Sequence, residues 1–419
     1  MSRRAVRHGV LTLADLSYRL ARPLIFRMSA QQAHESLLHV LRWADGQHWL
    51  IPLLGAVRSL TLPLAPVSVG GVLLESPLIL AAGLVKGDGF VSEDEALAAV
   101  SAGRNIMPGW RSLPTLVGLV EFGSFTRWPR LGNPGVVTWR DVSTRSTQNR
   151  VGLRNPGARA AALFLAERAN RLPRQFGINV AVSPGVSDVE QQTDEMLESL
   201  GAFLAAGVNP TWFTLNLSCP NTEDDPRGHQ TADEARQVCR AAIALLRGAM
   251  ESKERDFTAE GAAGTEKTQR ISAQRPHRSG DASHLPDRLS GRIPPLWVKV
   301  GPNLNDDQYR ALLRVFAETG VQAVVATNTL PWPAPNNPAL TAGVGGGRLH
   351  RRALEVVTLL QAERAAHGYP VDVIACGGVQ DGATLRSYAA LGVVAMQYWT
   401  ALVYRGPLAA ALIAWEGEP

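Results

Sequence analysis

The sequence predicts an α/β protein, a (β/α)8 TIM barrel with an N-terminal helical extension. From about residue 67, eight short apolar runs bounded by Gly, Pro or Asn alternate with amphipathic stretches. The runs are apolar throughout rather than alternating, which indicates parallel strands covered on both faces. Eight strand–helix units are the number that closes a barrel. An open, doubly wound sheet is the alternative, which is disfavoured because no GxGxxG opens a helix after the first strand.

The individual elements can be placed from these patterns. Strands are expected at 78–82, 117–122, 177–182, 212–217, 296–300, 322–327, 371–376 and 393–398. Helices, with apolar residues three and four apart, are expected at 191–206, 231–249, 305–319, 350–366 and 381–391. Residues 251–290 are polar, poor in aromatic residues and without a period, so we expect a flexible insertion there, within a barrel domain of 63–419.

Residues 1–62 are expected to form a separate segment of amphipathic helices, with Ser29 as the N-cap of the second one. Within residues 1–60, eight Arg face only three acidic residues, so this segment carries +5, which equals the net charge of the whole chain. Apolar stripes combined with basic excess favour docking on an anionic membrane surface. A helical cap on the barrel and an ordinary solvated basic surface are the alternatives.

Composition sets broad limits on the class of protein. The chain has 419 residues, 45% of them hydrophobic and 19% charged, which is typical of a globular protein with a large core. Its three cysteines form no CxxC pair, so the sequence indicates neither zinc nor disulfides, and a reducing compartment is expected. No apolar run is long enough to span a membrane. We expect neither metal nor nucleic acid among the partners.

Polar residues follow the predicted strands at the carboxyl end of the barrel, where barrel enzymes place their chemistry. The segments "AAGLVKG", "NLSCPN", "WVKVGPN" and "VATNT" bring amides and two lysines to this rim, which predicts a polar cavity. The glycine runs "AGVGGGR" and "CGGV" precede helices, where backbone N–H groups can bind a phosphate.

The order and spacing of "NLSCPNT", "VKVGPNL", "ATNT" and "YWTALVYRGP" resemble the dihydroorotate dehydrogenase family. These are FMN enzymes of pyrimidine biosynthesis built on a (β/α)8 barrel, and the resemblance runs from about residue 18 to 415. It implies oxidation of dihydroorotate to orotate, with hydride passing from the substrate to flavin N5.

The resemblance also implies a role for each matching residue. Cys219 stands where the family has its catalytic base, a role that a thiol can fill, although a packed, inert cysteine is the alternative. The positions matching substrate contacts are Lys86, Asn149, Asn216, Asn221, Asn328 and Thr329. The positions matching FMN contacts are Ala82, Gly83, Ser124, Asn179, Asn216, Lys299, Thr327, Gly346, Gly377, Gly378, Trp399 and Thr400.

Two features point to different branches of the family. The N-terminal helices resemble the quinone-reducing, membrane-associated branch, whereas a cysteine base belongs to soluble branches that use fumarate or NAD. The helices favour a quinone as electron acceptor and a peripheral site on the cytoplasmic side of the cell membrane, with a cytoplasmic enzyme as the alternative. Val85, Arg154 and Trp399 depart from the family pattern. Another FMN barrel oxidoreductase acting on a different dihydropyrimidine or cyclic amide, and a binding protein without turnover, remain alternatives.

Overall fold

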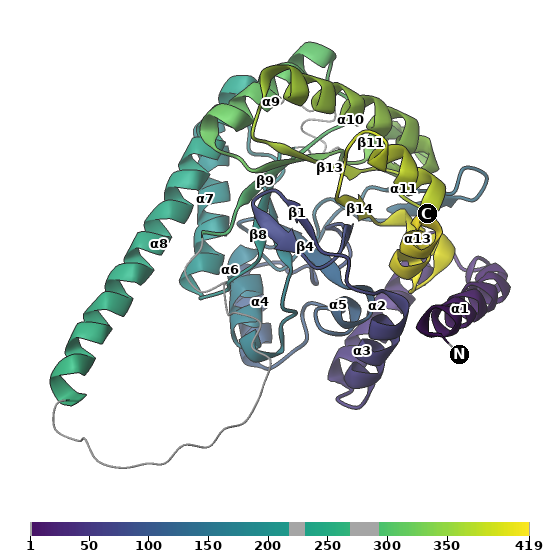
Figure 1. Cartoon of the computed structure of the whole chain (residues 1–419), viewed down its shortest axis with the longest axis horizontal. Coiled ribbons are helices and arrows are strands. Elements are labelled where there is room, and N and C mark those ends of the chain that lie inside the picture. The colour runs from purple at the N-terminus through teal and green to yellow at the C-terminus, as the bar shows by residue number, and fades with distance from the viewer. Residues whose placement is uncertain (1, 218–230, 269–292, 419) are drawn as a thin grey trace.

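The computed structural model describes residues 2–217, 231–268 and 293–418, and at its centre eight parallel strands close into a barrel (Figure 1). Closure is made where the last strand pairs with the first, through Met396 opposite Leu78. The eight strands correspond to the eight predicted runs, so the fold prediction is confirmed. In their order around the barrel they are β10 (Ala323–Ala326), β13 (Asp372–Cys376), β14 (Met396–Tyr398), β3 (Leu78–Leu80), β4 (Leu119–Phe125), β7 (Gly177–Ala181), β8 (Trp212–Asn216) and β9 (Leu296–Val300).

The amino end of the barrel is filled by apolar side chains. The indole rings of Trp212 and Trp297 stack with their centroids 4.5 Å apart and an interplanar angle of 17°. Beneath them lies a hairpin of β1 (Val67–Val69) and β2 (Val72–Leu74), and the Gly70 carbonyl at its turn accepts a hydrogen bond of 2.9 Å from Trp297 Nε1. The hairpin therefore closes this end of the barrel, and open polar space remains only towards the carboxyl end.

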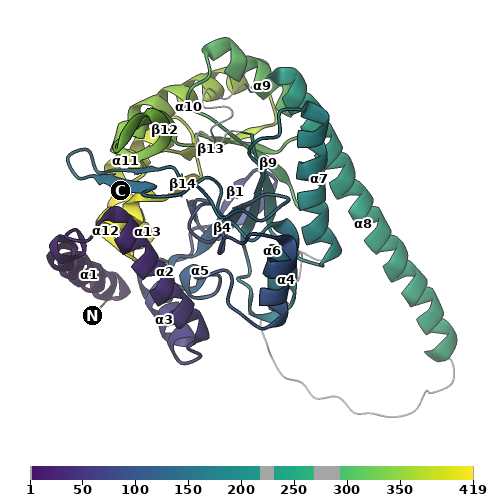
Figure 2. The same cartoon turned by 180° about the vertical axis from the view of Figure 1, so that it is seen from behind.

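Helices surround the barrel, and the five predicted ones are all present (Figure 2). Their amphipathic patterns pack apolar faces against the strands, as in α9, where Leu312, Leu313 and Phe316 are buried. The helices of this layer are α4 (Glu93–Ser101), α5 (Ser112–Val117), α6 (Ala158–Ala166), α7 (Val189–Ala205), α8 (Ala232–Thr268), α9 (Asp306–Thr319), α10 (Gly347–His367), α11 (Gly382–Ala389), α12 (Thr400–Arg405) and α13 (Ala409–Gly417).

Several boundaries differ from the sequence prediction. Strand β4 begins at Leu119 and continues to Phe125, because residues before Gly118 form α5 and this glycine, with φ of 88°, ends it. Helix α10 begins at Gly347, since the glycine-rich segment before it is a strand and not a turn.

Helix α8 runs to Thr268, about twenty residues beyond the expected end, and projects past the barrel in both views (Figures 1 and 2). The segment 251–268 was expected to be irregular because it has no apolar stripe. It is rich in Ala, Glu and Lys, which are strong helix formers, so an established helix can continue through it. The remainder of the expected insertion, 269–290, lies outside the described residues.

A second sheet that was not predicted lies beside the carboxyl end of the barrel. Its four antiparallel strands, in spatial order, are β11 (Leu330–Ala334), β12 (Asn337–Gly346), β6 (Ser146–Asn149) and β5 (Thr138–Asp141). The pairing of β12 with β6 sets Gly346 opposite Ser146 and Gly343 opposite Asn149. Two predicted site residues that are almost 200 positions apart, Asn149 and Gly346, thereby come from neighbouring strands.

The N-terminal segment forms three helices, α1 (Arg3–Ile25), α2 (Ala30–Gly46) and α3 (Leu50–Thr61), which contact the barrel domain. Ser29 caps α2 as expected, in a capping box with Gln32. The carboxylate of Asp45, which is buried, accepts hydrogen bonds from the backbone N–H groups of Gly109 and Ser112 at 2.7 and 2.8 Å. This contact fixes the end of α2 to the start of α5.

Helix α1 carries an exposed apolar stripe, which we define as Leu13, Leu16, Leu20 and Leu24; each is more than half exposed. The spacing of three and four residues places these leucines on one side of the helix. On the opposite side, Tyr18 Oη donates a hydrogen bond of 2.8 Å to the Val403 carbonyl of α12. Among the described helices, none is long and apolar enough to cross a bilayer.

The packing of the barrel interior gives a stability prediction. A Cβ at Gly177 would lie 2.2 Å from the Trp212 ring, so Gly177→Ala should lower the free energy of unfolding by about 3 kcal/mol or more, the upper range of overpacking. The matched control is Gly201→Ala in α7, where no atom lies within 4 Å. Because alanine favours the helix, it should raise stability by about 0.5–1 kcal/mol. Urea titration measures both, and equal stability of the two variants would contradict this packing.

Candidate active site

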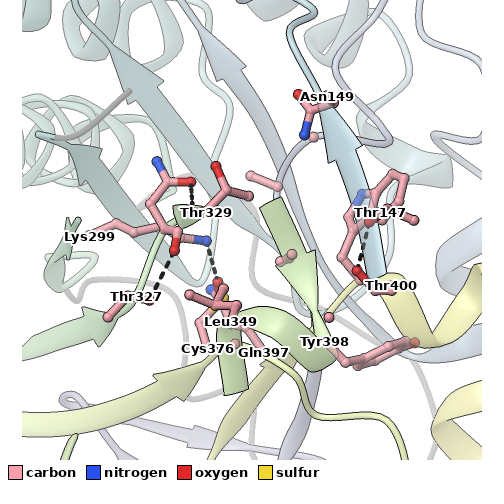
Figure 3. Close-up of a pocket in the computed structure, with 18 of the residues that line it drawn as sticks. Thr147, Asn149, Lys299, Thr327, Thr329, Leu349, Cys376, Gln397, Tyr398 and Thr400 are labelled. Carbon is pink, nitrogen blue, oxygen red and sulfur yellow. Dashed lines mark hydrogen bonds between the residues drawn. The ribbon is translucent and has the colours of Figure 1, made fainter. Parts of the chain in front are cut away.

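A pocket at the carboxyl ends of the barrel strands gathers most of the predicted site residues (Figure 3). Cys219 and Asn221 lie outside the described residues. Of the described predicted residues, Asn179 alone is not in the lining. The predicted residues that line the pocket are Ala82, Gly83, Lys86, Ser124, Asn149, Asn216, Lys299, Thr327, Asn328, Thr329, Gly346, Gly377, Gly378, Trp399 and Thr400.

One wall of the pocket is a row of connected amide groups. Asn328 Nδ2 donates to Asn216 Oδ1 at 3.2 Å, and Asn216 Nδ2 donates to Ser124 Oγ at 3.3 Å. The backbone N–H of Thr329 donates to Asn328 Oδ1 at 2.8 Å, while the Thr329 hydroxyl is buried without a partner among the described residues. These contacts fix the amide orientations, so the wall offers both donors and acceptors to a bound polar ring.

Beneath the pocket lies a buried polar chain, which we define as Lys299, Gln397, Glu121 and Asn179. Lys299 Nζ donates to Gln397 Oε1 at 2.9 Å, and Gln397 Nε2 donates to Glu121 Oε2. Asn179 Nδ2 donates to the other carboxylate oxygen, Glu121 Oε1, at 2.6 Å. Asn179 therefore lies in the layer below the lining, and its Oδ1 is buried with no partner among the described residues.

The other end of the pocket is built from glycine-rich backbone and two threonines. Gly346 has φ of 86°, and a Cβ there would lie 2.5 Å from the Arg145 carbonyl oxygen. Gly378 has φ of 70°, and a Cβ there would lie 2.5 Å from the His350 Cβ, so a larger residue does not fit at this position either. The hydroxyls of Thr147 and Thr400 are 2.9 Å apart. Figure 3 marks this contact with a dashed line. The positions of Gly346 and Gly378 therefore require glycine, because the backbone has a positive φ there and a Cβ would clash with neighbouring protein atoms.

Several lining residues were not predicted, namely His34, Thr138, Thr147, Gln148, Cys376 and Gln397. His34 comes from α2, and no sequence signal connects that helix with the rim of the barrel. Gln397 and Glu121 did carry a signal, because each is a single polar residue in an otherwise apolar strand. Burial raises the pKa of the Cys376 thiol, and the charge of Lys299 beside it opposes this shift. Cys376 is therefore a protonated thiol near neutral pH.

A smaller cavity adjoins the pocket and shares His34 and Lys86 with it; Arg154 lines the smaller cavity only. Desolvation by burial lowers the pKa of His34 to about 4, and the nearby charges of Lys86 and Arg154 act in the same direction. Arg154 Nη2 lies 3.7 Å from Asp88, a carboxylate that also pairs with Arg42 at 2.7 Å. His34 is thus held neutral between two cations at the mouth of the site.

The closed parallel barrel and the polar pocket at its carboxyl end define the class of the protein: an enzyme of (β/α)8 architecture with its active site at the strand ends. The family model described as dihydroorotate dehydrogenase matches residues 65–416. The chain belongs to the dihydroorotate dehydrogenase family.

Individual relatives agree with this assignment. A dihydroorotate dehydrogenase (quinone) from Chromobacterium violaceum is 28% identical over 394 residues, which cover 93% of this chain and 94% of that protein. A protein of the same name from Bordetella avium is 30% identical over 405 residues, with coverage of 93% and 94%. The solved structure of DHODH from Eimeria tenella in complex with ferulenol has a TM-score of 0.65, covers 94% and 93% of the two chains, and is 22% identical. This last comparison shows a common fold.

The lowered pKa of His34 gives a prediction about stability. In the unfolded chain His34 takes up a proton below about pH 6.5, whereas in the folded chain it stays neutral to about pH 4. The unfolded state binds more protons in this window, so acidification destabilises the folded state. His34→Gln removes this effect. Between about pH 6.5 and pH 5, the wild-type protein should lose about 1–2 kcal/mol more unfolding free energy than the variant. Urea titrations across this range measure it, and parallel losses would contradict it.

Proposed function

We propose that this protein oxidises dihydroorotate to orotate in pyrimidine biosynthesis, with FMN as its cofactor and a membrane quinone as electron acceptor. The observation that carries the proposal is the convergence of the predicted site residues on one pocket of a chain that matches the family model over residues 65–416. The names of its relatives, dihydroorotate dehydrogenase (quinone), support both the reaction and the acceptor.

The pocket fits FMN at both of its ends. At one end, Lys299 supplies a cation to the lining, and in the layer below it Asn179 Oδ1 has no partner among the described residues; a cation and an acceptor at this depth suit a polar isoalloxazine edge. At the other end, the backbone of Gly346 and Gly378 and the hydroxyls of Thr147 and Thr400 lie together in the lining, an arrangement suited to a phosphate. When bound, FMN accepts the hydride that leaves the substrate.

The residues of the chain have separate tasks in this reaction. Cys219 removes the C5 proton, a role that requires its thiolate. Lys86 pairs with the substrate carboxylate, and the amide wall of Asn216 and Asn328 binds the ring carbonyl and N–H groups. An analogue that lacks one of these groups leaves a buried amide unpaired, which penalises its binding.

Two contacts support the N-terminal helices as the site of membrane docking and acceptor entry. Helix α1 lies against α12, which begins at the pocket residue Thr400, and α2 supplies His34 to the lining. The α1 stripe faces away from the barrel and can insert into a lipid surface, to which the excess of Arg residues adds electrostatic attraction. We therefore propose a peripheral position on the cytoplasmic side of the cell membrane.

The experiment that tests the proposal is anaerobic mixing of the purified, yellow protein with dihydroorotate, followed by reoxidation with quinone, fumarate or NAD. Bleaching by dihydroorotate and fastest reoxidation by quinone support the proposal. If another dihydropyrimidine bleaches the flavin and dihydroorotate does not, the alternative substrate is favoured. This alternative is considered because Val85 and Arg154 depart from the family pattern. Fastest reoxidation by fumarate or NAD favours a soluble branch, to which a cysteine base belongs.

Cys219→Ala should retain FMN but slow flavin reduction by dihydroorotate by about 10²–10⁴-fold, the usual contribution of a general base. Stopped-flow absorbance of the flavin measures this rate. Cys219→Ser is the matched control. It should keep part of the activity with its optimum at higher pH, because a hydroxyl is a weaker acid than a thiol. Wild-type rates in Cys219→Ala would remove this residue from catalysis.

Replacing two leucines of the α1 stripe, in the double variant Leu16→Glu/Leu20→Glu, should weaken sedimentation with anionic vesicles and slow turnover with long-chain quinones. Each fully buried leucine contributes about 1.5–3 kcal/mol to insertion. Flavin reduction by dihydroorotate should not change, since neither residue lines the pocket. Val91→Glu, at a residue 77% exposed in the loop before α4, is the control. Undiminished vesicle binding by the double variant would contradict membrane docking through α1.

A further inference from the structure

The buried polar chain below the pocket contains two charged groups removed from water. Glu121, Asn179 and Gln397 have no exposed surface, and Lys299 is 6% exposed. Burying such groups costs several kcal/mol for each charge unless they are paired. Yet within the described residues neither Glu121 nor Lys299 forms a direct ion pair, and the amide of Gln397 stands between them.

The direction of every hydrogen bond in this chain is fixed by Lys299. An ammonium can only donate, so Gln397 must turn its Oε1 to Lys299 and its Nε2 to Glu121. Glu121 must then accept at Oε2, and it also accepts from Asn179 at Oε1. Both carboxylate oxygens are acceptors, as in an ionised carboxylate. Asn179 uses its Nδ2 for its bond to Glu121, and its Oδ1 has no partner among the described residues.

The chain connects strands that lie far apart in the sequence. Glu121 belongs to β4, Asn179 to β7, Lys299 to β9 and Gln397 to β14. The remaining titratable group facing Lys299 among the described residues is Cys376, whose thiol is protonated and neutral near neutral pH. Glu121 is thus the counter-charge of Lys299, and the side-chain amide of Gln397 connects the two groups.

We propose that Glu121 and Gln397 are positioning residues for the cofactor site: they fix Lys299 below the flavin, and the Glu121 carboxylate sets the flavin reduction potential. This inference rests on the proposed function in that FMN occupies the pocket. The reduced flavin carries a negative charge near Lys299, which stabilises it. Glu121 offsets part of this stabilisation, since its negative charge is connected to the same lysine through Gln397. Gln397 transmits the constraint because its amide cannot turn without breaking both hydrogen bonds.

The test uses full-length protein loaded with FMN and measures the flavin midpoint potential against a reference dye. Glu121→Gln removes the charge with almost no change in shape. It should favour the reduced flavin by tenfold or more in the ratio of reduced to oxidised cofactor, which corresponds to a rise of about 30 mV for a two-electron couple. A residue that only packed the barrel would lower FMN content or thermal stability without this signed shift.

A charge-neutral exchange provides the second variant. Glu121→Gln combined with Gln397→Glu keeps the same groups but moves the carboxylate into direct contact with Lys299. The ratio should then return to the wild-type value or fall below it, because the negative charge is nearer to the flavin. Glu195→Gln is the matched control. Glu195 is also buried, 8% exposed, but accepts from the Ser183 backbone N–H at 2.9 Å, outside the pocket lining. It should leave the potential unchanged.

Several results would overturn the inference. They are an unchanged potential in Glu121→Gln with FMN bound, a potential in the exchange variant equal to that of Glu121→Gln, or a shift as large in Glu195→Gln. Failure of both Glu121 variants to fold would also overturn it, because the chain would then support the barrel rather than the cofactor. If the wild-type protein itself does not bind FMN, the proposed function fails. If it binds FMN and is reduced by dihydroorotate, a missing shift removes only this inference.

Discussion

The site depends on closure of the barrel. A polar side chain buried inside the closed barrel is removed from water, so its hydrogen-bond partners must come from other groups inside the barrel. At the amino end, two tryptophans stack above a hairpin, and Trp297 Nε1 donates to the Gly70 carbonyl at the turn of that hairpin. Towards the carboxyl end, Lys299 and Glu121 are both removed from water. The side-chain amide of Gln397 hydrogen-bonds to both of them. The polar layer is therefore continuous with the pocket floor, and the cofactor site begins where the apolar packing ends.

The elements added to the barrel complete the pocket from the sides. The four-stranded sheet brings Asn149 and Gly346 together through the pairing of β12 with β6. The N-terminal helices are tied to the barrel domain by Asp45 and by Arg7, whose guanidinium donates to the Glu418 carboxylate just after α13. As a result, α2 delivers His34 to the pocket while α1 leaves its leucine stripe exposed. The N-terminal segment thus lines the pocket with one helix and exposes apolar side chains at the surface with another.

Much of the site could be predicted from the sequence, because in this fold the polar residues just after apolar strands all lie at the carboxyl end of the barrel. Thr327, Asn328 and Thr329 were placed by this rule, and all three line the pocket. The rule fails for residues within strands and outside the barrel. Gln397 and Glu121 lie inside apolar runs, where a single polar residue is noticeable in the sequence, but that they are connected to Lys299 is evident only once β14 and β4 take their places around the closed barrel. His34 lies more than 40 residues before the first barrel strand, and its approach depends on how α2 packs.

The sequence by itself determined the eight strands, the helices between them, the Ser29 cap and the residue types at the strand ends. These follow from local periodicity, turn residues and capping chemistry, which act over a few positions. Tertiary structure decided the second sheet, the place of His34 and the partners of Lys299. Those depend on closure of β14 against β3 and on pairings between residues hundreds of positions apart. No local pattern encodes such pairings, because the chain meets them only when the barrel closes.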